Sequence, residues 1–244
     1  MSVKRIAHVT LSMQSGGIEN LILSLVLNGH PGRFQFYCYC LDHGGSLLSE
    51  LEELGARTRI MRRNPGLDLS LFFNLARCFC QDGINVVHTH NQAAHFYGCL
   101  AGRMAGIKTI INTEHSRHYI EERKIRRLEK RFLSFITTRM VTVSEELYEA
   151  ALYRDKIQEK KLAIVGNGID LTRFRQTSDA RLSELRNEIG IDDTDKVVSI
   201  IARLHPIKNH HLLLQAMQLI IKDSPEIKLL IVGDGELRDE LEKK

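Results

Sequence analysis

Apolar runs of β type alternate with segments of helical period along the first two thirds of the chain. The runs cover residues 4–12, 34–41, 58–61, 85–90, 108–115, 139–144 and 162–170, and the helical segments between them cover residues from 18, 46–54, 68–81, 92–105, 119–136 and 145–153. Strands that are almost continuously apolar, each followed by a helix, indicate a parallel sheet covered on both faces. We therefore predict a doubly wound, Rossmann-like α/β domain over residues 1–170.

A polar stretch after Asp170 separates this domain from a second series of strands and helices. The stretch contains one predicted helix, 178–189, and has the character of a linker. Two further strands, 196–204 and 227–235, are each followed by a helical segment. Because a two-stranded parallel sheet cannot bury both of its faces, we expect residues 171–244 to be a linker and the start of an incomplete second Rossmann-like domain.

The composition is that of a folded protein, with 43% hydrophobic and 26% charged residues in 244. No apolar run reaches the roughly 18 residues of a membrane span, and the N-terminus turns polar too early for a signal peptide. We therefore expect a cytoplasmic protein. Its five cysteines are predicted to be buried free thiols rather than disulfides or zinc ligands, because their Cys-x-Cys spacing is unusual for zinc: Cys38, Cys40, Cys78, Cys80 and Cys99.

The basic surplus is concentrated between Arg117 and Arg131, where seven Lys or Arg face three Glu and account for the whole net charge of +4. Helical spacing puts the apolar positions on one face (Ile125, Leu128, Phe132, Phe135, Ile136) and basic ones on another (Arg123, Arg126, Arg127, Lys130). A solvated basic face is one interpretation. Attraction to an anionic membrane surface is the other, with the protein peripheral on the inner face of the membrane. Nucleic acid is disfavoured, because no aromatic interleaving or known nucleic-acid motif is present.

Polar residues and glycines follow the predicted strands, at the edge where open α/β sheets bind ligands. Gly16 and Gly17 lie between the first strand and the first helix, where missing side chains would let a phosphate approach free N–H groups. A tight turn is the alternative. The dinucleotide pattern Gly-x-Gly-x-x-Gly is absent, which disfavours a nicotinamide-dependent oxidoreductase.

Three histidines lie at strand ends. His115 follows a carboxylate, and its imidazole can donate a hydrogen bond to a substrate hydroxyl or phosphate, or have a structural role. His88 and His90 are two apart and share one face of a strand. A metal site formed by these two with His115 is disfavoured, because no carboxylate or cysteine stands at ligand spacing, and we predict no metal.

Two cations, Arg203 and Lys208, stand at the start of a predicted helix. There they oppose the helix dipole and repel one another, which favours a site for an anion such as a diphosphate. A solvated pair is the alternative.

Seven short motifs occur in a characteristic order, all at strand ends: GGIEN, HTHN, TEH, VSEEL, NGID, ARLHPIKNHHLLLQA and LLIVGDGELRDEL. Together they resemble the retaining, nucleotide-sugar-dependent glycosyltransferases of the GT-B fold, in particular the group 1 family, over nearly the whole chain. The resemblance implies transfer of a sugar from a nucleotide-diphosphate donor to a glycan or lipid-linked acceptor.

By this resemblance, His115 would contact the transferred sugar, and Arg203 and Lys208 would neutralise the pyrophosphate leaving group. Fixed cations there stabilise the charge that develops as the glycosidic bond breaks, so no metal is required. The nucleotide sugar is then a co-substrate, and no cofactor is expected.

The remaining motif residues would bind the two substrates. The resemblance implies that four glycines contact the donor: Gly16 and Gly17 at the diphosphate, and Gly233 and Gly235 at the nucleotide. It implies that His90 and Asn91, at the end of the fourth predicted strand, contact the acceptor.

The chain departs from the family after its last motif. The family continues with a Glu-x7-Glu segment that holds the sugar and ribose of the donor, whereas Glu236 and Glu240 in the last motif are only four apart. We therefore expect the donor-binding domain to be incomplete. A non-catalytic module that binds the acceptor or a membrane surface is the alternative function.

Overall fold

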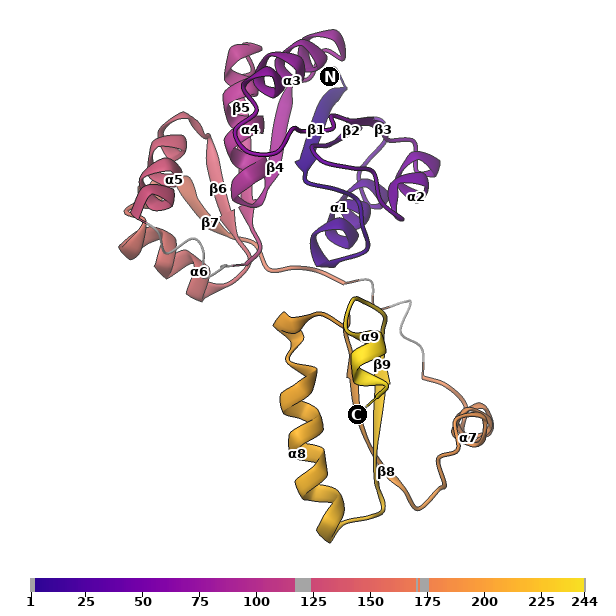
Figure 1. The fold of residues 1–244 in the computed structure, drawn as a ribbon. Coiled ribbons are helices and arrows are strands. Elements are labelled where there is room, and N and C mark those ends of the chain that lie inside the picture. The colour runs from indigo at the N-terminus through magenta and orange to yellow at the C-terminus, as the bar shows by residue number, and fades with distance from the viewer. Residues whose placement is uncertain (1–2, 117–123, 170, 172–175, 244) are drawn as a thin grey trace. The chain divides into compact units, whose positions relative to one another are not determined.

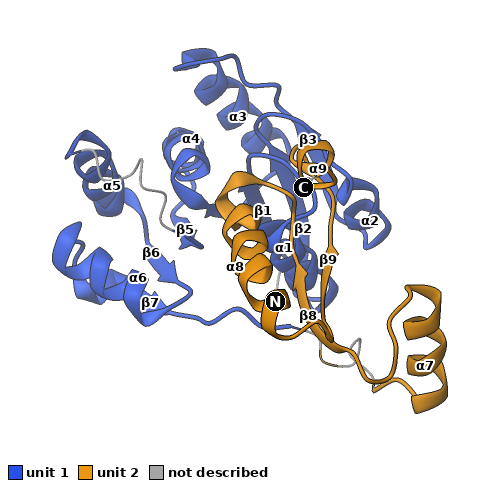
Figure 2. Ribbon diagram, turned by 60° about the horizontal axis from the view of Figure 1, so that its bottom comes forward, with its two compact units in different colours: residues 1–170 blue, residues 171–244 orange. Residues whose placement is uncertain are grey.

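The computed structural model describes residues 3–116, 124–169, 171 and 176–243 (Figure 1). The chain divides into two compact units, residues 1–170 and 171–244, which Figure 2 distinguishes by colour. No helix in the described ranges has the length and apolar character needed to cross a bilayer.

Unit 1, residues 1–170, is built on a seven-stranded sheet in the order β3-β2-β1-β4-β5-β6-β7. Every neighbouring pair is parallel, as expected for strands that are each followed by a helix. The strands are β1 (Lys4–Thr10), β2 (Phe34–Cys40), β3 (Arg57–Ile60), β4 (Val86–His90), β5 (Thr109–Glu114), β6 (Arg139–Thr142) and β7 (Leu162–Ile164). The predicted doubly wound α/β fold is thereby confirmed.

Helices pack on both faces of this sheet (Figure 1). They are α1 (Gly17–Leu27), α2 (Leu48–Glu53), α3 (Leu69–Gln81), α4 (Asn91–Met104), α5 (Lys124–Ile136) and α6 (Glu145–Glu149), the last continued by a π-turn, Ala150–Arg154. Side chains of α1 and α2 form one apolar cluster with Cys38 and Cys40 of β2. Side chains of α3, α4 and α5 form a larger cluster with Val9, Tyr39 and Val87 on the opposite face.

The alternation of side chains along β1 explains this two-faced core. Ala7 and Val9 point into the cluster under α3 and α4, so His8 between them points to the face that carries α1. A strand in a sheet packed on both sides is apolar on both faces, and a buried polar residue there needs a partner. His8 has one, as shown below.

Unit 2, residues 171–244, contains the two-stranded parallel sheet of β8 (Lys196–Ile201) and β9 (Ile227–Val232). Its helices are α7 (Asp179–Glu188), α8 (His210–Asp223) and α9 (Arg238–Leu241). The element order matches the predicted linker helix followed by two strand–helix units. Ser178 caps α7 by accepting a hydrogen bond from the Arg181 backbone N–H at 3.4 Å.

All five cysteines are free, as predicted. Cys38, Cys40 and Cys99 are buried, but Cys78 is half-buried and Cys80 is exposed, so the prediction of buried thiols is wrong for Cys80. The physical reason is the face of α3 that meets the core. That face carries Leu71, Phe72, Leu75, Ala76 and Phe79, and Cys80 follows it onto the solvent side.

Candidate functional site

The candidate site of unit 1 lies at the carboxyl ends of β1 and β4. These strands are neighbours although three helices and two strands separate them in sequence, and the strand order reverses between them. Such a switch point leaves a crevice where open α/β sheets bind ligands. Gly16 and Gly17 follow β1, Asn91 follows His90 of β4, and His115 follows the adjacent strand β5. The topology thus brings these predicted residues to one edge.

The glycine pair opens α1. Gly16 is the N-cap, with an extended backbone (φ −174°, ψ 177°) that any residue adopts, and a Cβ added at Gly17 would meet no heavy atom within 4 Å. Neither backbone strain nor packing within this unit therefore requires glycine at position 17, which leaves room for a ligand. Glu19 in the first turn already complements the helix dipole, so an incoming phosphate would find N–H groups beside a carboxylate.

A row of histidines crosses the sheet at this edge. His8 Nδ1 lies 3.1 Å from His90 Nε2, and His90 Nδ1 lies 3.0 Å from His115 Nε2. His90, only 1% exposed, is therefore enclosed between the other two rings. A ligand that approaches the row from the solvent would contact the half-buried ring of His115, and it would affect His90 only through that ring.

A fourth histidine packs against this row. The His88 ring lies with its centroid 4.4 Å from that of His90, and its Nε2 is 2.8 Å from Thr113 Oγ1. Burial lowers the pKa of His8 and of His115 to about 4. Burial, together with the neighbouring imidazoles, holds the pKa of His88 and His90 well below the usual value. All four rings are therefore neutral at pH 7, and each can donate one hydrogen bond and accept another.

Three of these rings also satisfy the spacing of a metal site. One ring nitrogen from each of His8, His88 and His90 lies within 4.8 Å of the others. The metal site considered in the sequence analysis consists of His88, His90 and His115, so it contains His115 in place of His8. Neutral imidazoles suit zinc, copper or nickel. However, both nitrogens of His90 already face imidazole nitrogens at hydrogen-bonding distance, so a hydrogen-bonded row accounts for the arrangement without an ion.

Asn91 holds the loop that carries His115. Its backbone is left-handed, with φ 65°, and its Oδ1 accepts a hydrogen bond from the His115 backbone N–H at 3.1 Å. Asparagine is one of the few residues other than glycine that adopt this conformation readily. Asn91 therefore positions His115, and its contact with an acceptor stays a prediction.

An apolar cavity of about 560 Å³ adjoins the histidines on the α1 face of the sheet. His8 and His88 line it together with Ile6, Val86, Ile111 and Leu25. The sequence pattern predicts neither this cavity nor the place of His8 in its wall. The only signal in the sequence was a histidine inside the first apolar strand, and the neighbour of that strand could not be read from spacing.

In unit 2 the predicted cations follow β8. Arg203 and Lys208 are both exposed, and Lys208 ends a short 3-10 turn, Pro206–Lys208, directly before α8. His205 Nδ1 accepts a hydrogen bond from the Ile207 backbone N–H at 3.3 Å and so caps this turn. The cations thus stand at the N-terminal end of α8, and their contact with a diphosphate stays a prediction.

Gly233 and Gly235 have a structural reason of their own. Their φ angles are 156° and 155°, and a Cβ on either would collide with the backbone of Ala202 or Leu204. The Leu204 N–H donates to Asp234 O at 2.9 Å, which holds this turn against the segment containing Arg203. Close backbone approach thus explains both glycines, and their contact with a nucleotide stays a prediction.

The basic segment is arranged differently from the expectation. Residues 117–123, including Arg117 and Arg123, lie outside the described ranges. In α5, Lys130 is buried while Ile125, Leu128, Phe132 and Phe135 are exposed. The interpretation of a solvated basic face is therefore wrong for Lys130, because its ammonium lies 2.9 Å from Glu114 Oε2 and 3.1 Å from Asp155 Oδ2.

Family models match both parts of the chain. Residues 15–173 match the family described as Glycosyltransferase Family 4, and residues 182–244 match Glycosyl transferases group 1. An Escherichia coli relative is named UDP-Gal:alpha-D-GlcNAc-diphosphoundecaprenol alpha-1,3-galactosyltransferase. It is 26% identical over 97% of this chain, which spans 64% of the relative's length.

Solved structures share the fold. The Anabaena protein HepE, crystallised in complex with UDP, superposes with a TM-score of 0.78 at 18% identity, over 99% of this chain and 64% of its own. A glycosyltransferase from Rickettsia africae gives a TM-score of 0.75 at 18% identity, over 99% of this chain and 63% of its own. The chain thus spans slightly less than two thirds of these proteins.

Proposed function

Because the chain belongs to glycosyltransferase family 4, we propose that it serves the transfer of a sugar from a nucleotide-diphosphate donor to a glycan or lipid-linked acceptor, with retention at the anomeric carbon. The name of the Escherichia coli relative combines a UDP-sugar with a diphosphoundecaprenol-linked acceptor, and HepE was crystallised with UDP. A UDP-sugar and a lipid-linked sugar are therefore the first substrates to test.

The observation that carries this proposal is the edge of the sheet at the β1–β4 switch point. There the open space at Gly17 and the half-buried ring of His115 both follow the carboxyl ends of strands, which supports the proposal. In the proposed reaction, Gly16 and Gly17 accommodate the donor diphosphate, and His115 hydrogen-bonds the transferred sugar. Because the pKa of His115 is lowered to about 4, its ring is neutral and adds no positive charge beside an electron-poor anomeric carbon.

In the proposed reaction, the positive charges that bind the diphosphate come from unit 2. Arg203 and Lys208 neutralise the diphosphate as the bond to the sugar breaks, and Gly233 and Gly235 border the nucleotide. On the side of unit 1, His90 and Asn91 belong to the acceptor site, His90 through its contact with the His115 ring and Asn91 through the loop that it holds. With two cations at the leaving group, the reaction as proposed uses no metal. We also propose that the protein is cytoplasmic.

Calorimetry with the 244-residue chain tests the donor site. We expect UDP to bind, and Lys208→Ala to weaken that binding by about tenfold, because it removes a charge-assisted contact. Lys222→Ala, at the other end of α8 and equally exposed, is the matched control and is expected to bind UDP as the unaltered chain does. Unchanged affinity in Lys208→Ala would refute the role of this lysine, and no heat with UDP, GDP or their sugars would refute a donor site formed by these 244 residues.

An anionic membrane surface, expected from the sequence as a partner through residues 117–131, completes the proposal. A lipid-linked acceptor would bring the protein to such a surface. Residues 124–131, the described part of this segment, belong to α5, and the exposed apolar side chains of that helix support the membrane partner.

A further inference from the structure

Helix α5 exposes an apolar stripe. Ile125, Leu128, Phe132 and Phe135 are 71%, 65%, 60% and 57% exposed, and their spacing of three or four residues aligns them along one side of the helix. Exposed apolar residues are common singly, but an aligned row of large ones usually marks a surface that meets a partner or a membrane.

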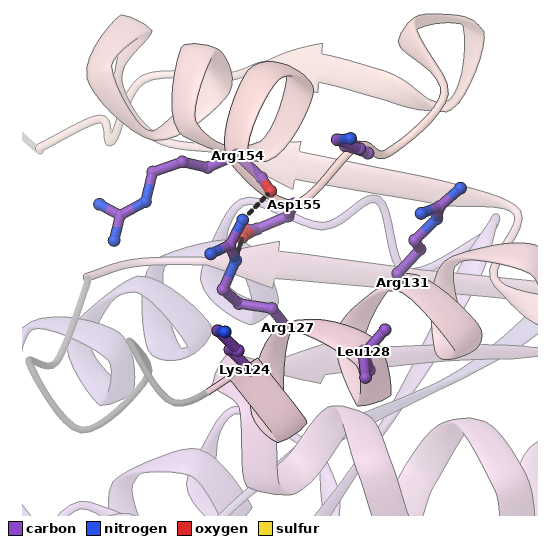
Figure 3. A pocket seen from close by; sticks show the side chains of 7 residues that line it. Lys124, Arg127, Leu128, Arg131, Arg154 and Asp155 are labelled. Atoms are coloured by element: carbon purple, nitrogen blue, oxygen red, sulfur yellow. Dashed lines mark hydrogen bonds and ion pairs between the residues drawn. The ribbon is translucent and has the colours of Figure 1, made fainter.

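A cationic pocket borders this stripe. The cavity, about 290 Å³, lies between α5 and residues 154–156. Five cations line it, namely Lys124, Arg127, Arg131, Arg154 and Lys156, together with Asp155 and Leu128. Figure 3 shows Lys124, Arg127, Leu128 and Arg131 on the helix, and Arg154 and Asp155 on the facing segment. Leu128 belongs to both the pocket and the stripe, so the two surfaces are continuous.

Among the described residues that line the pocket, Asp155 has the one carboxylate, and that carboxylate is already compensated. Asp155 is 5% exposed, and its carboxylate lies 3.1 Å from Lys130 Nζ and 3.9 Å from Arg127 Nε. The Arg127 guanidinium also donates a hydrogen bond to Arg154 O at 2.6 Å, which ties the helix to the facing segment (Figure 3). The pocket is therefore held in shape by internal contacts, and its described lining carries five cations and one carboxylate.

We propose that this pocket binds the phosphate of an anionic membrane lipid while the stripe enters the apolar boundary of the same bilayer. Arginine and lysine recognise phosphate by charge-assisted hydrogen bonds, and an amphipathic surface with cations beside large apolar residues is typical of interfacial binding. A soluble phosphate would account for the cations but not for the stripe. The inference rests on the proposed membrane partner, but not on sugar transfer or on the donor site.

Vesicle sedimentation with the 244-residue chain tests the pocket. Phosphatidylcholine vesicles carry either phosphatidic acid or oleate, matched in surface potential, so that only one set offers a phosphate monoester without a choline group. We expect tighter binding to the phosphatidic acid vesicles. The variant Lys124→Gln/Arg131→Gln/Lys156→Gln should lose at least about tenfold of that binding, because each cation near an anionic surface contributes separately.

A control removes the same charge elsewhere on unit 1. Lys4→Gln/Arg77→Gln/Lys108→Gln alters three exposed cations outside the pocket and should retain the preference for phosphatidic acid. Equal binding to phosphatidic acid and oleate vesicles, or equal losses in the two triple variants, would overturn the phosphate pocket and leave the membrane partner standing. No binding to any anionic vesicle would overturn both. Neither result bears on UDP binding, which is measured without lipid.

The stripe is tested separately. Ile125→Ser/Phe132→Ser should weaken binding to phosphatidic acid vesicles at least about tenfold, because two large side chains no longer enter the bilayer. Leu69→Ser/Phe73→Ser, on α3 and exposed to a similar degree, should bind normally. Normal binding by the α5 variant would show that the stripe does not meet the membrane and would overturn this half of the proposal.

Discussion

At the scale of single residues, the central feature is a neutral histidine row at the edge of a parallel sheet. His8, His90 and His115 contact one another through ring nitrogens at 3.0–3.1 Å. Burial lowers the pKa of His8 and His115 to about 4, so these rings stay uncharged in the folded protein at a pH where they are charged in the unfolded chain. The row therefore couples stability to pH.

The sign of that coupling gives a prediction. Between pH 6.5 and 4 the unfolded chain binds more protons than the folded one, so the free energy of unfolding falls as the pH falls. The contribution of His8 alone is about 2 kcal/mol between about pH 7 and pH 5. In His8→Phe, the free energy of unfolding measured in urea should fall by about that much less between pH 7 and pH 5. Ile22→Val, a core change without a titratable group, should keep the slope of the unaltered protein, and an equal slope in His8→Phe would contradict the assignment.

At the scale of elements, α5 buries a charged residue beside Leu133 and exposes four large apolar residues. Its lysine at position 130 is buried against two carboxylates, and its large apolar residues are exposed. Burial acts to lower the pKa of Lys130, but the charges of Glu114 and Asp155 outweigh it and the pKa is raised. The helix is thus held to β5 and to the segment after α6 by charges as well as by Leu133 in the core, and its apolar stripe stays exposed.

Removal of this lysine should be costly. Lys130→Met removes the nearest cation from two buried carboxylates, and we expect a loss of about 3–5 kcal/mol in the free energy of unfolding. Lys124→Met on the same helix is exposed and should change stability by less than about 0.5 kcal/mol. Neutralising both carboxylates as well, with Glu114→Gln and Asp155→Asn, should restore much of the loss. A loss below about 1 kcal/mol in urea unfolding of Lys130→Met would contradict this role.

At the scale of the whole molecule, the two units differ in how much core they bury. Unit 1 has a seven-stranded sheet with apolar clusters on both faces. Among the described residues of unit 2, the buried apolar side chains are Ile191, Leu204 and Met217, and strand residues such as Ile201 are exposed. A two-stranded parallel sheet with one long helix has too little buried surface for independent stability.

This difference predicts how the units behave when separated. A fragment of residues 1–170 should unfold in one cooperative transition in urea, followed by circular dichroism, because its core lies within that range. A fragment of residues 171–244 should show no cooperative transition. A sharp transition in the second fragment would contradict the burial argument, as would its absence in the first.

Much of the fold could be predicted from local pattern. The near-continuous apolar strands and the helices after them implied the parallel sheet, and Ser178 and Pro206 stand where α7 and the turn before α8 begin. The ordered motifs indicated the family, which the family models confirm. These properties depend on neighbours within a few residues of each other, so the chain itself carries them.

The candidate site was only half predictable. The chain order placed Gly16, His90 and His115 at strand ends, and a doubly wound sheet brings strand ends together. It did not say that β1 pairs with β4, which sets His8 opposite His88 and beside His90. Contacts of this kind join residues about eighty positions apart, so no local pattern records them.

What the sequence determined by itself is therefore the succession of strands and helices, the family, and the residue types at each strand end. Only the tertiary structure decided which side chains meet, as for the histidine row, and which face of α5 is buried. Helical spacing shows that a helix has two faces, but the partners of Lys130 come from Glu114 and Asp155, on segments before and after it. Which face turns inward depends on those partners, because a buried charge is stable only where opposite charges surround it.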